Sequence, residues 1–159
     1  MTRRRKNRIL ISNESSRRLP TTRIRMAVDT LLQMYDQPPS EVSILFTSDE
    51  AIRVLNRDFR GIDEATDVLT FPGPGFPGTP LGDIAISVPF AERQAQHHGH
   101  PKDDELVLLA LHGGLHLLGF DDETDEDRED MVRRMNDVAT QLGMEPKLAW
   151  SSVHEGDDR

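Results

Sequence analysis

Residues Ala110 to Asp122 read ALHGGLHLLGFDD, and the rest of the chain is organised around this stretch. His112 and His116 are four residues apart, which places both imidazoles on one face of a helix, about one turn apart. Gly119 is the residue type that commonly ends a helix, and Asp122 follows three positions later. Two nitrogen ligands from a rigid helix and one oxygen ligand from the following turn converge on one metal ion and leave a position open for water. The pattern therefore predicts a catalytic metal site.

The helix that carries these histidines begins near Pro101 and is apolar on nearly all sides. Its apolar residues include Leu106, Val107, Leu108, Leu109, Leu111, Leu115 and Leu118. A helix with this pattern is buried at the centre of a domain. Gly113 and Gly114 lie inside it, and each costs roughly 1 kcal/mol relative to alanine. The pair indicates either that another group approaches the backbone beside the histidines or that two helices pack closely there.

Hydrophobic patterns on both sides of this helix predict further strands and helices. Strands are expected at 9–12, 42–46, 68–71 and 84–86, and further helices at about 21–37, 48–60, 89–97 and 125–142. Thr47 and Glu50 have the spacing of a capping box, and Thr124 is expected to cap the last helix. Residues 72–80, PGPGFPGTP, exclude regular structure, so the strands on either side form a hairpin-like pair or a sheet edge. The order predicts an α+β fold: a small mixed sheet of about four strands packed with helices, around a central buried helix that carries the metal ligands.

The chain length of 159 residues suits one sizeable core rather than two. We expect a basic arm over residues 1–8, a single catalytic domain over residues 9–143 and a loose C-terminal tail over residues 144–159. Charge is unevenly spread, because the first 25 residues contain nine cations and a single acid, Glu14. The net charge of -9 argues against indiscriminate nucleic-acid binding, but the basic end leaves a polyanionic partner open.

Composition also limits where the protein works. The chain has no cysteine, so disulfides and thiolate metal sites are excluded, which agrees with a reducing cytoplasm. No apolar run approaches the roughly 18 residues that a membrane helix needs. The basic N-terminus is followed only by Ile9, Leu10 and Ile11, which is too short for a signal-peptide core. We therefore expect a cytoplasmic protein with no membrane partner.

The spacing of the ligands is similar to the zinc-binding segment of metzincin peptidases, H-E-x-x-H-x-x-G-x-x-H. Gly113 stands where those peptidases carry the glutamate that acts as general base, and Asp122 stands where they carry the third histidine. Without that glutamate the peptidase mechanism lacks its proton acceptor. A metallopeptidase-like hydrolase with the same metal site is therefore the less favoured alternative.

A stronger resemblance is to the YbeY family, bacterial metal-dependent endoribonucleases of rRNA maturation. Its signature, H-G-x-L-H-L-x-G-[YF]-D-H, matches residues 112–121 and differs at the last position, Asp122. Further family-like blocks stand in the right order: LN at 55–56, FR at 59–60, TDVLTFP at 66–72, LGDI at 81–84 and Met131. The resemblance covers about residues 41–142. It implies a single α+β domain, zinc, a cytoplasmic location and a role in forming the 3′ end of small-subunit rRNA.

The resemblance also implies roles for individual residues. His112 and His116 become metal ligands, His112 is expected to be catalytic, and Asp122 takes the place of the third histidine. Aspartate can ligate zinc, so the site survives the exchange. Its negative charge should make a metal-bound water less acidic than in a three-histidine site. The same charge should make harder metals such as manganese more acceptable, and nickel also stays open. Asp121 is the nearest rival ligand.

Arg60 matches the functionally implicated arginine of the family. A guanidinium is permanently charged and forks onto two phosphate oxygens, which suits phosphodiester cleavage. Position alone would fit an ordinary surface arginine at a helix C-terminus, but with the resemblance we expect Arg60 to be catalytic. By contrast, His97, His98 and His100 fall around a solvated loop, and we favour no metal or substrate role for them.

The leading hypothesis is a metal-dependent, single-strand-specific endoribonuclease in rRNA processing and ribosome biogenesis. Its expected partners are single-stranded rRNA and the small ribosomal subunit or its proteins, and its cofactor is one divalent ion, zinc. Besides the peptidase, a non-catalytic ribosome-assembly factor with a structural metal stays open. A fourth protein ligand on the metal would favour that third interpretation.

Overall fold

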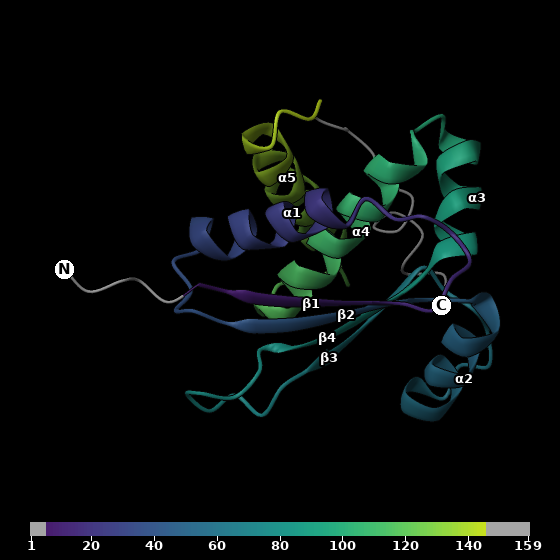
Figure 1. Ribbon diagram of the computed structural model, residues 1–159, viewed down its shortest axis with the longest axis horizontal. Helices are drawn as coiled ribbons and strands as arrows, with labels where there is room; N and C mark the ends of the chain where they lie inside the picture. Colours follow the sequence, from purple (N-terminus) through teal and green to yellow (C-terminus); the bar gives the residue numbers. More distant parts are fainter. Residues whose placement is uncertain (1–5, 146–159) are drawn as a thin grey trace.

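In the part of the chain that the structure describes, four strands form one mixed sheet in the order β1-β2-β4-β3 (Figure 1). The computed structural model of the chain describes residues 6–145, and its strands are β1 (Arg8–Asn13), β2 (Glu41–Thr47), β3 (Val68–Pro72) and β4 (Gly82–Ser87). Strand β2 pairs in parallel with both β1 and β4, whereas β3 pairs antiparallel with β4. The predicted hairpin-like pair is therefore β3 and β4, and β3 is also a sheet edge.

Among the described residues, five helices cover this sheet unequally. They are α1 (Thr21–Met34), α2 (Asp49–Arg60), α3 (Val88–His98), α4 (Lys102–Leu117) and α5 (Asp125–Gln141). Helices α1, α4 and α5 gather on one face, whereas α2 lies on the other (Figure 1). The element order is the predicted one, and the α+β fold class is confirmed.

Strand β2 shows how the sequence builds the two layers. Val42, Ile44 and Phe46 alternate along the strand and belong to the large core beneath α1 and α4. Leu45 points the opposite way and joins a smaller cluster beneath α2, whose buried members are Ile52, Leu69 and Ala85. The period of two therefore assigns one face of the sheet to each layer.

Helix α4 is the centre of the larger layer. Its residues from Glu105 to Leu115 are all buried, and it contacts α1, α3, α5, β3 and β4. A helix with neighbours on so many sides needs apolar residues all round, as the sequence predicted.

Gly113 and Gly114 permit this packing. A Cβ atom on Gly113 would lie 2.8 Å from Ile84 Cγ2 of β4, and one on Gly114 would lie 2.5 Å from Leu31 Cδ2 of α1. Gly114 thus fits the predicted close approach of two helices, whereas Gly113 lets α4 lie directly on the sheet. Both glycines are explained by packing.

Of the two predicted helix N-caps, the one of α5 is confirmed and the one of α2 is wrong. Thr124 caps α5 as predicted, since its hydroxyl accepts a hydrogen bond from the Asp127 amide at 3.0 Å. The predicted capping box at Thr47 is wrong, because Ser48 is the N-cap of α2 and accepts from the Ala51 amide at 3.2 Å. Thr47 instead ends β2, paired with Ser87 of β4.

The predicted domain boundaries stay predictions. Strand β1 begins at Arg8, the last residue of the expected basic arm, and α5 ends at Gln141. Residues 1–5 of the arm and 146–159 of the tail lie outside the described residues. Within the described part of the chain, no helix is both long enough and apolar enough to cross a membrane.

We predict that Gly113→Ala lowers the free energy of unfolding by about 1 kcal/mol, because overpacking costs about 1–3 kcal/mol and the gain in helix propensity returns about 1. The new methyl would meet three atoms of the stiff Ile84 side chain. Gly114→Ala meets only the flexible end of Leu31 and serves as the comparison, with a change near zero. Urea unfolding of the metal-free protein measures both values. A Gly113→Ala protein as stable as the parent would contradict this account of the packing.

Candidate metal centre

The end of α4 turns the chain back on itself. Gly119 adopts φ +99°, a left-handed conformation that glycine tolerates best. The Gly119 amide donates to the His116 carbonyl and the Phe120 amide to the Leu115 carbonyl, each at 3.0 Å. These two bonds form a Schellman motif, which satisfies the last carbonyls of the helix. The turn returns Asp122 to the face of α4 that carries the histidines.

Three ligand atoms converge at this point. His112 Nε2 lies 3.0 Å from His116 Nε2 and 3.0 Å from Asp122 Oδ2. His116 Nε2 lies 3.5 Å from the same carboxylate oxygen. The three atoms therefore form a compact triangle that draws one atom from each predicted ligand.

This triangle has the size of one face of a zinc coordination sphere. Zinc binds imidazole nitrogen and carboxylate oxygen at about 2.0–2.2 Å, and the corners of such a tetrahedron are separated by roughly 3.3–3.5 Å. Neutral imidazoles carry only one proton each, so the three close contacts cannot all be good hydrogen bonds. A cation at the centre would satisfy all three atoms at once. The donor set therefore fits a divalent metal.

Exposure and charge also suit a reactive site. The His112 side chain is 4% exposed, whereas those of His116 and Asp122 are 24% and 20% exposed. Burial raises the pKa of the Asp122 carboxyl, but hydrogen bonds from His112 and His116 outweigh it and hold this pKa far below its usual range. The carboxylate is therefore anionic at neutral pH and ready to bind a cation.

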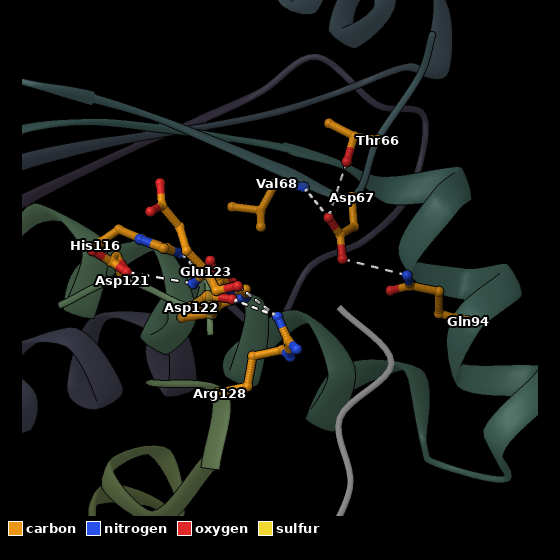
Figure 2. A network of polar contacts seen from close by, with 10 residues as sticks. Thr66, Asp67, Val68, Gln94, His116, Asp121, Asp122, Glu123 and Arg128 are labelled. Carbon is orange, nitrogen blue, oxygen red and sulfur yellow. Dashed lines mark hydrogen bonds and ion pairs between the residues drawn. The ribbon is translucent and has the colours of Figure 1, made fainter. Parts of the chain in front are cut away.

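A buried arginine supports the loop that carries Asp122. Arg128 of α5 donates through Nη1 to the carbonyl of Asp122 at 3.2 Å and to that of Glu123 at 3.0 Å (Figure 2). The other end of its guanidinium pairs with Asp125. The sequence interpretation overlooked Arg128. The sequence contains one weak feature that points to Arg128: it is the only cation among residues 121–130, which include eight acids.

An aromatic contact holds the same loop from a second direction. Phe120 packs edge to face against Tyr35 at the end of α1, with ring centroids 5.4 Å apart. The Arg134 guanidinium lies 4.1 Å from the Phe120 ring centre and donates to the Tyr35 hydroxyl at 3.0 Å. The segment after α4 is therefore fixed by both α1 and α5.

A second polar network ties strand β3 to helix α3. The buried Asp67 carboxylate accepts from the Val68 amide at 2.8 Å and from the Gln94 side chain at 3.3 Å (Figure 2). Thr66 also donates to Asp67, at 3.3 Å. This network fixes the segment that leads into β3, which belongs to the TDVLTFP block of the sequence.

The remaining candidates lie elsewhere. Asp121 is exposed and accepts from the Glu123 amide at 3.4 Å, so it is Asp122 that faces the histidines. Arg60 is the exposed last residue of α2. Helix α2 as a whole lies on the opposite face of the sheet from α4 (Figure 1). The rings of His97, His98 and His100 lie near one another, but among residues 6–145 only the triangle forms a group of potential metal ligands.

Fold and site together define a class: a small α+β protein with a candidate site for a single metal ion at the end of a buried helix. Comparison with known proteins then identifies the family. The family described as Endoribonuclease YbeY matches residues 10–143. The chain therefore belongs to the YbeY family, which confirms the resemblance seen in the sequence.

Individual relatives agree with this assignment. The Endoribonuclease YbeY of Persephonella marina is 39% identical over 136 residues, which cover 82% of this chain and 89% of that protein. That of Nautilia profundicola is 46% identical over 101 residues, which cover 60% and 73%. The solution structure of TM1509 from Thermotoga maritima matches with a TM-score of 0.58 at 26% identity, covering 85% of this chain and 91% of that one. The predicted class of activity, a hydrolytic endoribonuclease, is confirmed.

We predict that zinc binding depends on Asp122 and not on its neighbour. Asp122→Ala and His112→Ala should each weaken binding by more than about 100-fold, since even changes outside the ligand set cost 10–100-fold. Asp121→Asn is the matched control and should bind like the parent. Titration calorimetry on protein first stripped with a chelator measures all four affinities. Equal losses in Asp121→Asn and Asp122→Ala would contradict the assignment.

Proposed function

We propose that this chain cleaves single-stranded RNA during maturation of the small-subunit rRNA 3′ end, with one zinc ion held by His112, His116 and Asp122. The observation that carries the metal assignment is the triangle of ligand atoms, 3.0–3.5 Å on a side. Membership of the YbeY family supports RNA as the substrate class. We propose a cytoplasmic location and the small ribosomal subunit as partner on the same ground.

When bound, the metal would supply Lewis acidity and lower the pKa of a coordinated water. The protein's own part is to fix the coordination geometry. His112 and His116 come from a rigid buried helix, and Asp122 contributes a charge that partly neutralises the cation. Manganese or nickel in place of zinc is compatible with these three donors.

The RNA backbone would be held by cations outside the metal centre. Arg60 is exposed and, within the described part of the chain, pairs with no carboxylate, so its guanidinium is available for a phosphate. Lys6 and Arg25 line a cleft of about 580 Å³ beside β1 and α1. We propose that Arg60 binds a phosphate of the RNA strand that reaches the metal centre and that the basic N-terminal region adds non-specific attraction.

The structure weakens the peptidase alternative. Position 113 would have to carry the general-base glutamate, but a Cβ atom there would lie 2.8 Å from Ile84 Cγ2 of β4. A side chain at this position would therefore be directed at β4. The structural-metal alternative expects a fourth ligand, and the group found among residues 6–145 contains three.

We predict that purified protein cuts single-stranded RNA carrying the small-subunit rRNA 3′ end, and that chelation abolishes cutting until zinc is restored. His112→Ala should lower the cleavage rate by at least about 100-fold, because metal catalysis contributes several kcal/mol. Asp121→Asn is the control and should cut normally. Gel analysis of the labelled RNA gives the rates, and a peptide library incubated in parallel tests the peptidase. Undiminished cutting by His112→Ala would refute the proposal.

We also predict that Arg60→Gln lowers kcat/KM for RNA by at least about tenfold, with little recovery in Arg60→Lys, because lysine lacks the planar fork. Arg57→Gln is the matched control, since Arg57 is exposed on the same helix and pairs with Asp58 at 3.2 Å. Kinetics at several salt concentrations separate specific contacts from general attraction. Equal losses of kcat/KM in Arg57→Gln and Arg60→Gln would contradict a specific role of Arg60 in the reaction.

A further inference from the structure

Arg128 occupies a position that helix stability alone does not favour. It is the fourth residue after the cap Thr124, so it lies at the positive end of the α5 dipole, where cations are disfavoured. It is also only 8% exposed, and burying a charge is costly unless it is well paired. The acids of the helix's first turn, Asp125 to Asp127, carry the charge that this end of the dipole favours.

The partners of Arg128 explain why it is there. Nη1 is within hydrogen-bond distance of two successive carbonyls, those of Asp122 and Glu123, at 3.2 and 3.0 Å. Asp125 pairs with the other end of the guanidinium and balances its charge. The planar fork is suited to this task, because its donors diverge at fixed angles. Arg128 therefore fixes the backbone of the residue that supplies the carboxylate.

The exchange of histidine for aspartate at position 122 makes this backbone position important. A carboxylate reaches less far from the main chain than an imidazole does. The main chain at Asp122 must therefore lie closer to His112 and His116 than a third histidine would require. A donor that holds the Asp122 carbonyl directly is a means of keeping it there.

We propose that Arg128 is a positioning residue of the metal centre, which aims the Asp122 carboxylate at the two histidines by holding the carbonyls of Asp122 and Glu123. The inference rests on the proposed metal centre and adds to it a residue outside the ligand set. Such residues commonly change metal affinity by 10–100-fold when they are replaced. Arg134 holds Phe120 of the same segment, so the loop does not depend on Arg128 for its whole fold.

The test compares three variants of the full chain: Arg128→Gln, Arg128→Lys and the control Arg133→Gln. Arg133 is an exposed cation of the same helix and pairs with Asp130 rather than with the loop. Zinc affinity is measured by competition with a chelating indicator, and the visible absorption of the cobalt-loaded protein reports ligand geometry. Thermal unfolding of the metal-free variants shows separately whether the fold has weakened.

We expect Arg128→Gln to bind zinc about 10–100-fold more weakly, with weaker cobalt bands, and Arg128→Lys to fall between it and the parent. Arg133→Gln should match the parent. A folded Arg128→Gln protein with parental zinc affinity and cobalt spectrum would overturn the proposal, even if its thermal midpoint had dropped. If Arg128→Gln fails to fold, the zinc affinity and the cobalt spectrum of Arg128→Lys test the proposal instead, and parental values of both would overturn it. A parent that binds zinc no better than His112→Ala would instead overturn the metal centre itself.

Discussion

Two imidazole nitrogens and one carboxylate oxygen lie 3.0–3.5 Å apart at the end of a leucine-rich helix, and the rest of the structure maintains this arrangement. Polar atoms in such surroundings need partners, and one cation supplies all three. To keep both histidines rigid, α4 is packed against neighbours on nearly every side. Gly113 and Gly114 permit that packing, and the turn at Gly119 brings Asp122 back to the two histidines.

Asp122 as the proposed third ligand would give the metal centre a different electrostatic balance from the three-histidine site that the sequence resemblance implies. The ligand is anionic, so the loaded site would carry one positive charge less than a three-histidine site. The surrounding sequence is also strongly acidic, with Arg128 as the one cation among residues 121–130. This negative field should strengthen the binding of a metal cation. It should also make a metal-bound water less acidic and so less readily activated. RNA, a polyanion, must then rely on cations elsewhere, which is the role proposed for Arg60.

The predictable features were those that depend on local periodicity. The i, i+4 spacing of His112 and His116 fixes their common face, and the element order follows from apolar patterns and breakers. The cap of α2 was misplaced by one residue, because β2 stays paired with β4 through Thr47 and Ser87 before the helix begins. Arg128 was overlooked because its partners are carbonyls whose direction depends on how the loop folds. The part played by Arg60 depends on bound RNA and stays a prediction.

Anomalous diffraction at the zinc edge from crystals of the zinc-loaded protein tests the central claim most directly. We expect one peak bonded to Nε2 of His112, Nε2 of His116 and a carboxylate oxygen of Asp122, each at about 2.0–2.2 Å, with a fourth, non-protein oxygen. A peak that leaves Asp122 unbound would contradict the ligand assignment. A peak closed by a fourth protein ligand would contradict the catalytic role of the metal.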